Sequence, residues 1–433
     1  MKFNLMPPAD QLVMMMERIY DYGMTTTSGG NLSILDSNGD IWITPGSVDK
    51  GSLTRDDMVC IKPDGTVIGK HKPSSEFPFH KKLYETRSDI RAVLHAHPPA
   101  LVAFSIVRKT PNTNIIPNVN QVCGPIGIAK YGLPGSTNLG DKIADQFKQN
   151  DNMHTVILEN HGVVIGHKDL FTAFMAFETI EYCARLHINT NIIGKERALS
   201  KENLQLSEEK LNPVMDEFIQ TTHSTVEKEA RVQMAKLIHR AYKQRLFTST
   251  QGTFSQRIDN DTFIITPHNM DRKYLEPEDI VTIKGNMKES GKVPSRSVLL
   301  HKTIYEKHPE INSLIIAHPH NVMAFALTET EFDSRTIPES YIMLRDVPKV
   351  PFGSTFINYE NLADIISTVD PVVLVENDCV LVAGTSLLNA FDRLEVTEYT
   401  AKSIILSVHI GDIVKISANQ ISEIDEAFHL EKK

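Results

Sequence analysis

Hydrophobic positions along the first half of the chain follow two periods, one helical and one extended. Apolar residues recur with helical spacing over residues 11–22, 79–86 and 170–190, which predicts three helices, since a 3.6-residue repeat places these side chains on one face. Short apolar runs bounded by turn residues predict strands. The expected strands are residues 33–35, 41–44, 58–61, 67–69, 92–97, 154–158 and 163–165.

Strands and helices alternate in the order helix, several strands, helix, strand, helix. The last two strands flank a short polar turn and are expected to form a hairpin. Ser74 or Ser75 is a plausible N-cap for the helix at 79–86. The pattern predicts an α/β layered domain with a largely antiparallel sheet.

The same pattern returns in the second half as a tandem repeat. Ala92 to Phe104 reads AVLHAHPPALVAF, and Ser313 to Phe325 reads SLIIAHPHNVMAF. Other matches include the Ile-Thr-Pro stretches that begin at positions 43 and 265, and the histidines at 80 and 301. The offset stays at 221 or 222 positions throughout this series, so we interpret the chain as a duplication.

The boundary between the copies is expected in a polar, charged stretch near residues 200–225. We predict one domain over residues 1–210 and a second over residues 225–425. Helix-like apolar spacing at 213–220 and 226–245 predicts that part of this region is helical.

Composition narrows the functional classes. The 433 residues carry a net charge of −9, which argues against a general binder of nucleic acid or of anionic membranes. The absence of an eighteen-residue apolar run argues against a membrane span, and the first seventeen residues lack a signal-peptide pattern. The four cysteines have no C-x-x-C spacing, so we expect reduced thiols and a cytoplasmic protein.

Three histidines are the candidates for a metal centre. His95 and His97 stand at i and i+2 on an extended segment and project from one face, while His161 lies in a distant Asn-His-Gly turn. Three imidazoles with a fourth position open are typical of catalytic zinc, and Mn²⁺, Co²⁺ or Fe²⁺ are alternatives. The other interpretation is a set of core histidines bonded to the backbone.

Glu76 and three polar turns complete the candidate site. A carboxylate near a metal-bound substrate can shuttle a proton, although Glu76 is also compatible with a helix first turn favoured by the helix dipole. The turns that begin at Ser28, Thr44 and Ser74 offer amides and hydroxyls that could cradle a phosphate. No nucleotide-binding glycine motif is present.

In these segments the chain resembles the class II aldolase/adducin family. The matching pieces are Ser28 to Ser33, Ile43-Thr44-Pro45, Pro73 to Glu76 with His80 and Tyr84, His95-Ala96-His97, and Asn160-His161-Gly162. Among family members, the L-fuculose-1-phosphate aldolases are most similar to the first half. The resemblance implies tandem α/β/α three-layer domains, each with a central, mostly antiparallel sheet.

The resemblance also implies chemistry. A divalent metal, usually zinc, would bind His95, His97 and His161, and Glu76 would be the catalytic acid/base. The substrate phosphate would lie among Gly30, Asn31, Gly46, Ser47, Ser74 and Ser75. The implied reaction is reversible cleavage of a ketose 1-phosphate into dihydroxyacetone phosphate and an aldehyde through a metal-stabilised enediolate.

Two other activities and one non-catalytic role remain open at this point. Gln121 stands where the aldolases carry a tyrosine, which leaves room for a decarboxylase of related keto-acid phosphates or a sugar-phosphate 4-epimerase. A non-catalytic interaction protein of the adducin type is the alternative from another class.

The second copy is expected to be a degenerate pseudo-enzyme. Ile316 replaces His95, Asp378 replaces His161 and Ser297 replaces Glu76, whereas His318 matches His97. His320, two residues after His318, could act as a further metal ligand. The expected role of this copy is structural, in place of a neighbouring subunit, and a second metal site on His318, His320 and Asp378 is the alternative. The resemblance implies a homo-oligomer, with two chains forming a pseudo-tetrameric ring of domains.

Overall fold

The computed structural model describes residues 3–430, apart from the side chain at position 4. By its internal contacts the chain divides into two compact units. The first comprises Met1–Thr113 and Asn118–Arg185, and the second comprises Asn114–Pro117 and Leu186–Lys433. This division does not test the sequence-based boundary at 210–225, which stays a prediction.

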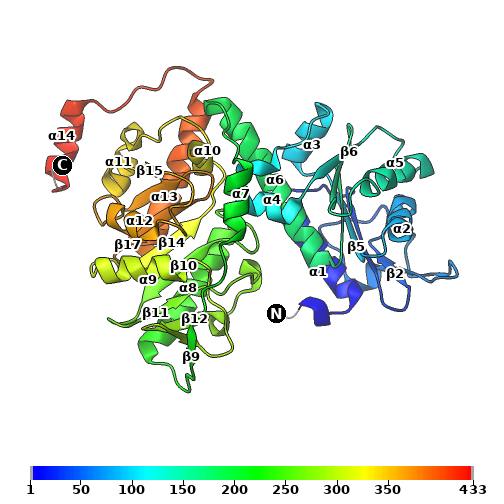
Figure 1. Ribbon diagram of the computed structural model, residues 1–433. Coiled ribbons are helices and arrows are strands. Elements are labelled where there is room, and N and C mark those ends of the chain that lie inside the picture. Colours follow the sequence, from blue (N-terminus) through cyan, green and yellow to red (C-terminus); the bar gives the residue numbers. More distant parts are fainter. Residues whose placement is uncertain (1–2, 431–433) are drawn as a thin grey trace. The chain divides into compact units, whose positions relative to one another are not determined.

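The first unit is built on an eight-stranded sheet with the order β4-β3-β2-β1-β5-β8-β7-β6 (Figure 1). Every neighbouring pair is antiparallel except β6 and β7, which are parallel. The strands are β1 (Asn31–Leu35), β2 (Ile41–Ile43), β3 (Val59–Ile61), β4 (Val67–Ile68), β5 (Ala92–Ala96), β6 (Ile126–Ala129), β7 (Thr155–Leu158) and β8 (Val163–His167).

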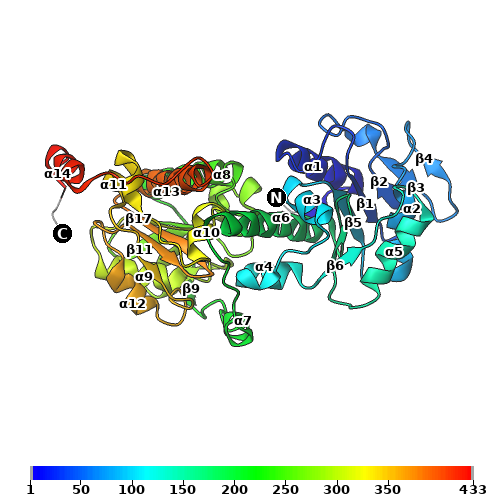
Figure 2. The ribbon, with the colours of Figure 1, turned by 90° about the horizontal axis from the view of Figure 1, so that it is seen from above.

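Helices cover both faces of this sheet. Helices α2 and α5 pack on one face, and α1 lies on the other, against β1 and β2 (Figure 2). Ser136 caps α5 by accepting a hydrogen bond from the amide of Leu139. The helices are α1 (Pro8–Asp21), α2 (Phe77–Thr86), α3 (Pro99–Ile106), α4 (Pro117–Cys123), α5 (Thr137–Phe147) and α6 (Leu170–Ile193).

The second unit repeats this plan in a nine-stranded sheet with the order β15-β16-β17-β14-β10-β11-β12-β13-β9. Each strand of the first sheet has a counterpart, and β9 is an addition at the edge. The strands are β9 (Asp216–Phe218), β10 (Thr253–Arg257), β11 (Thr262–Ile265), β12 (Val281–Lys284), β13 (Met287–Glu289), β14 (Ser313–Ala317), β15 (Lys349–Val350), β16 (Val372–Val375) and β17 (Cys379–Gly384).

The helices of the second unit again form two layers. In Figure 2, α8 and α13 lie on one side of the sheet and α9 and α12 on the other. The helices are α7 (Lys201–Glu208), α8 (Thr225–Lys243), α9 (Val298–Lys307), α10 (Val322–Ala326), α11 (Pro338–Leu344), α12 (Tyr359–Ile365), α13 (Leu387–Ser407) and α14 (Ala418–Ala427).

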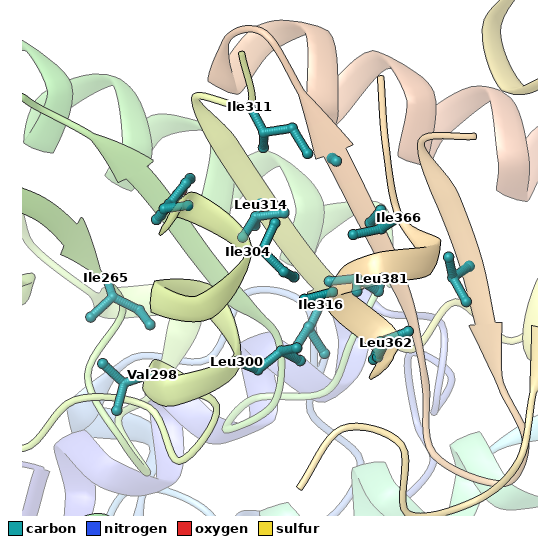
Figure 3. Close-up of a cluster of buried hydrophobic side chains, with 14 of the residues drawn as sticks. Ile265, Val298, Leu300, Ile304, Ile311, Leu314, Ile316, Leu362, Ile366 and Leu381 are labelled. Carbon is teal, nitrogen blue, oxygen red and sulfur yellow. The ribbon is translucent and has the colours of Figure 1, made fainter. Parts of the chain in front are cut away.

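The core of the second unit lies between its sheet and α9 with α12. Figure 3 shows Leu300 and Ile304 of α9 facing Ile316 and Leu381 of the sheet. Burial of such side chains contributes about 1.5–3 kcal/mol each. Ile316 is the residue at the position of His95, so a ligand position of the first copy has become part of an apolar cluster.

Two sequence-based expectations are wrong. Residues 213–220 do not form a helix, because Asp216–Phe218 is a strand that pairs in parallel with Met287–Glu289. An edge strand depends on a distant partner, which local apolar spacing cannot reveal. Neither Ser74 nor Ser75 is the N-cap of α2. That position belongs to Glu76, and the Ser74 hydroxyl accepts a hydrogen bond from the Glu76 amide.

The helix expected at 226–245 is confirmed as α8. The helices α3, α5 and α7 and the strand β6 were not anticipated. Within the described part of the chain, no helix combines the length and apolarity that a membrane crossing requires.

Candidate metal centre and hydrogen-bond relay

Three histidine rings converge at one end of the first sheet. His95 is on β5, His97 directly follows it, and His161 lies in the turn between β7 and β8. Because Ala96 pairs with Val163, this turn is held beside the end of β5. The ring centroids are 4.7 to 5.1 Å apart. Among the described residues, this is the one group of three or more metal-type ligands whose donor atoms converge, all within 4.8 Å of one another.

The Asn-His-Gly turn has a local cause. Asn160 has a φ of 55°, in the left-handed region that asparagine tolerates better than most residues. Gly162 is needed for close approach, since a Cβ there would lie 2.5 Å from the carbonyl oxygen of Ala96 and 2.6 Å from the His97 ring. The sequence therefore folds this turn tightly against β5 and presents His161 to the other two histidines.

The histidines are held in the form that binds metal. His95 donates from Nδ1 to the Val163 carbonyl at 2.9 Å, which leaves the lone pair on Nε2. Burial lowers the pKa of both His95 and His97 to about 3 and also lowers the pKa of His161. The imidazoles are thus neutral near pH 7, as metal ligation requires.

Glu76 brings a carboxylate to the same point. Its Oε2 lies 3.2 Å from Nε2 of His95, and its Oε1 lies 3.7 Å from Nε2 of His161. Two atoms here, Oε1 of Glu76 and Nδ1 of His161, are buried without a hydrogen-bond partner. Buried polar atoms are nearly always satisfied, so these orphans indicate a site that a ligand completes.

The donor set fits a divalent cation. The Nε2 atoms of His95 and His97 are 3.0 Å apart, close to the roughly 3.4 Å separation of two imidazole nitrogens on tetrahedral zinc. Three neutral imidazoles suit zinc, and they also suit manganese, cobalt or iron. The residues present therefore fit a bound metal.

A buried hydrogen-bond relay holds Glu76 from behind. Asn31 donates from Nδ2 to Oε2 of Glu76 at 2.7 Å and accepts at Oδ1 from Nε2 of His80 at 2.5 Å. Ser33 lies between Nδ1 of His80 and the hydroxyl of Tyr84, at 2.7 and 2.6 Å. Since Oδ1 only accepts, His80 carries its proton on Nε2, and each donor in the chain points toward Glu76.

The residues expected at the phosphate lie in turns next to this centre. Gly30 packs on β5, where a Cβ would meet the His95 carbonyl oxygen at 2.9 Å. Gly46 packs on Pro73 and Ser74, and an isolated bridge joins Pro45 to Pro73. Of the residues expected at the phosphate, Ser47 and Ser75 are exposed, whereas Asn31 and Ser74 are buried. Both ends of the Asn31 amide are bonded inside the relay, and the phosphate-binding role of this set stays a prediction.

Sequence reasoning missed Lys50, which supports one of these turns. Its Nζ donates to the carbonyl of Pro45, and burial lowers its pKa to about 8. The second copy places Arg272 at the same position, 222 residues on, where it donates to the carbonyl of Pro267. A cation at this repeated position was the signal that could have identified it.

Glu181 of α6 was also missed. Its carboxylate accepts hydrogen bonds from the amides of Ala100 and Leu101 at the start of α3, which follows β5. Glu398 accepts in the same way from the amides of Asn321 and Val322 in the second unit. Anionic groups at helix N-termini are stabilising, so this contact is part of the duplicated scaffold.

The second copy keeps the serine, histidine and tyrosine of the hydrogen-bond relay but loses the asparagine and the carboxylate at its other end. Ser255 lies between His301 and Tyr305 at 2.6 and 2.7 Å, as in the first copy. Thr253 replaces Asn31 and bonds instead to Ser295 at 2.7 Å. The buried Nε2 of His301 is consequently without a partner, and no carboxylate is held where Glu76 lies in the first copy.

Comparison with known proteins agrees with this repeat. The family model "Class II Aldolase and Adducin N-terminal domain" matches residues 10–188 and again residues 232–405. The L-fuculose phosphate aldolase of Methanococcus maripaludis is 34% identical over 173 residues, which cover 40% of this chain and 92% of that protein. The 5-deoxy-D-ribulose 1-phosphate aldolase of Bacillus thuringiensis is 30% identical, covering 45% of this chain and 91% of that protein.

Other relatives are named for a different activity, a decarboxylation. The 3-oxo-tetronate 4-phosphate decarboxylase of Escherichia coli is 28% identical, covering 41% of this chain and 84% of that protein. A solved structure of an L-fuculose 1-phosphate aldolase is 29% identical, with a TM-score of 0.42, and covers 47% of this chain and 95% of that one. With two segments that together span most of its length, the chain belongs to the class II aldolase and adducin N-terminal domain family and carries that domain twice in tandem.

Proposed function

We propose that the first unit is a metal-dependent aldolase that reversibly cleaves a ketose 1-phosphate into dihydroxyacetone phosphate and an aldehyde. The observation that carries this proposal is the convergence of three neutral imidazoles with the Glu76 carboxylate, which lies 3.2 Å from His95 and 3.7 Å from His161. Sugar-phosphate aldolases among the relatives support it.

His95, His97 and His161 would hold the metal. When bound, a divalent cation supplies a Lewis acid that polarises the substrate carbonyl and stabilises the charge left when the carbon–carbon bond breaks. Zinc is the metal we propose, because three imidazoles and an open position are its usual catalytic arrangement.

Glu76 would move the proton. In cleavage, the C4 hydroxyl gives its proton to the Glu76 carboxylate, the bond between C3 and C4 breaks, the aldehyde leaves, and the resulting acid form of Glu76 returns the proton to C3 of the three-carbon fragment. In condensation, the carboxylate form removes the proton from C3 and delivers it to the oxygen of the aldehyde as the bond forms. The orphaned Oε1 is the oxygen available for this transfer, since Oε2 is held by Asn31. The turns at Gly30, Gly46 and Ser74 would orient the phosphate through amides and hydroxyls.

A second candidate is decarboxylation of a 3-oxo acid phosphate, which needs the same three ligands and ends with the same proton return. One observation favours it: the decarboxylases among the relatives. Gln121, where the resemblance implies a tyrosine in the aldolases, is compatible with this reaction. Release of carbon dioxide from a phosphorylated 3-oxo acid, without condensation of dihydroxyacetone phosphate with any aldehyde, would establish this second reaction.

The test is incubation of the purified protein with dihydroxyacetone phosphate and a panel of aldehydes, with and without chelator. We expect condensation products that disappear with chelator and return with zinc. A parallel panel of 3-oxo acid phosphates distinguishes the two reactions. Activity in neither panel, or activity that survives complete metal removal, would contradict the proposal.

Assembly into a homo-oligomer is part of the proposed function. A chain that carries two copies of the domain suits a closed ring of two chains. Native mass spectrometry should give a dimer, and a strict monomer with full activity would rule this out.

A further inference from the structure

The second copy holds a buried carboxylate at the position where the first copy has the candidate metal ligand His161. Asp378 follows Asn377 in the turn between β16 and β17, and Asn377 has a φ of 54°, the counterpart of Asn160 before His161. The Asp378 side chain is 13% exposed. A buried carboxylate without a counter-charge is strongly destabilising, so the cation that pairs with Asp378 determines the chemistry at this position.

That partner is Lys210, which comes from the segment after α7. Its Nζ lies 3.7 Å from Oδ2 of Asp378 and donates to the hydroxyl of Thr355 at 3.3 Å. Thr355 in turn donates to Oδ2 of Asp378. The ammonium also lies 5.1 Å from the ring centre of Phe356, a cation–π contact.

The backbone around Lys210 is held in place at two points. Arg296, which stands where the first copy has Ser75, donates to the Lys210 carbonyl at 3.2 Å. Eight residues farther on, Phe218 ends β9, which pairs with β13 at the sheet edge. The segment between α7 and β9 therefore belongs to the second unit, and its lysine is inserted beside Asp378.

His318, the counterpart of His97, borders the same charges. Burial lowers its pKa to about 4, and the charge of Lys210 adds to that effect while Asp378 opposes it. His318 is therefore neutral near pH 7. The former ligand positions thus hold one carboxylate, one neutral imidazole and, at Ile316, a core side chain.

We propose that the former ligand positions of the second copy form a cation site whose permanent occupant is the chain's own Lys210 ammonium, in place of a metal ion. Lys210 is the cation that forms an ion pair with the single carboxylate that remains, and the charge of Arg296 adds to the stabilisation of that carboxylate. Three imidazoles suit a dication, whereas this reduced set suits an ammonium. The second copy consequently takes up no metal, and its fold is tied to the segment that carries Lys210.

Chemical rescue tests this directly on the full-length chain. Lys210→Ala should lower the unfolding temperature of the second unit by roughly 6–20 °C, the range expected when one member of a buried ion pair is removed from a domain of this size. Ethylammonium chloride should restore part of that loss, since the small amine can enter the space left by the lysine. Choline chloride at equal concentration is too bulky and should not. Lys201→Ala, an exposed lysine on α7, is the matched control and should respond to neither salt.

A double-mutant cycle provides the second measurement. Lys210→Met and Asp378→Asn should each destabilise the chain, and the double variant should be less destabilised than the sum of the two. Additive effects, or equal responses of Lys210→Ala and Lys201→Ala to ethylammonium, would overturn the proposal. So would a second metal equivalent bound by the wild-type chain.

Discussion

The metal ligands act as a set, and His97 is the residue whose removal tests that set most cleanly. Its ring is partly exposed at the site, whereas His95 is fully buried in the sheet and donates to Val163. We predict that His97→Ala abolishes metal binding and activity while the fold is retained. Elemental analysis and circular dichroism check both parts, and unchanged metal content would refute the ligand assignment.

Glu76 tests the proton-transfer step. Glu76→Gln keeps the size of the side chain and removes the ionisable group, so we expect the metal to stay bound. Turnover should fall by about 10²–10⁴, the range for a general acid or base. Steady-state kinetics with elemental analysis on the same preparation measures both. Wild-type turnover would exclude Glu76 from the chemistry.

Asn31 is the residue that distinguishes the relay of the first copy from that of the second. We predict that Asn31→Thr, which installs the residue of the second copy, leaves the metal content unchanged and lowers turnover by roughly 10–100-fold, as is typical for residues that orient a site from behind. The loss should fall on kcat rather than KM, because Glu76 loses its orientation.

The reciprocal change, Thr253→Asn in the second copy, is the matched control and should leave turnover unchanged. A rise in KM alone for Asn31→Thr would instead support the phosphate-binding role of this residue.

At the scale of elements, the contact between α9 and β10 contains a pH-sensitive group. His301 is fully buried, and burial lowers its pKa to about 3, whereas a free histidine titrates near 6.5. Below pH 6.5 the unfolded chain binds a proton that the folded chain does not, so stability falls as the pH falls from 6.5 toward 3.

We predict that His301 alone lowers the free energy of unfolding by about 2 kcal/mol when the pH falls from 7 to 5. His301→Gln cannot titrate and should show a correspondingly weaker dependence on pH, even if it is less stable overall. Urea unfolding at the two pH values measures the difference. His409→Gln, at an exposed position, should keep the wild-type dependence, and an unchanged slope in His301→Gln would contradict the assignment.

Element by element, the sequence predicted best where apolar periodicity was long and local. The helices near 11–22 and 226–245 and the strand that carries His95 were found because burial on one face imposes a period. The strand at Asp216–Phe218 was read as a helix, since its stability comes from pairing with Met287–Glu289 rather than from its own residues. The N-cap of α2 was misplaced for a related reason: Glu76 is fixed by Asn31 and the histidines, not by a local cap.

At the scale of the whole molecule, the fold occurs twice, but among the described residues only the first copy contains a converged set of histidines. We predict one metal per chain, and Asp378→Ala should leave that number unchanged, because Asp378 pairs with Lys210. Elemental analysis of wild type and variant decides the matter. A drop in metal content in Asp378→Ala would mean that the second copy also binds metal.

The sequence alone determined the duplication, the family and the three histidines, because spacing and repeated motifs are properties of the chain itself. Tertiary structure decided the rest. Only the folded sheet shows that Asn31 connects His80 to Glu76, that Lys50 lies under a polar turn, and that Lys210 is inserted beside Asp378. Asparagine and lysine are common on protein surfaces, so their presence in the sequence does not reveal these contacts. Their roles arise from burial, because a buried polar or charged group needs a hydrogen-bond partner or a counter-charge.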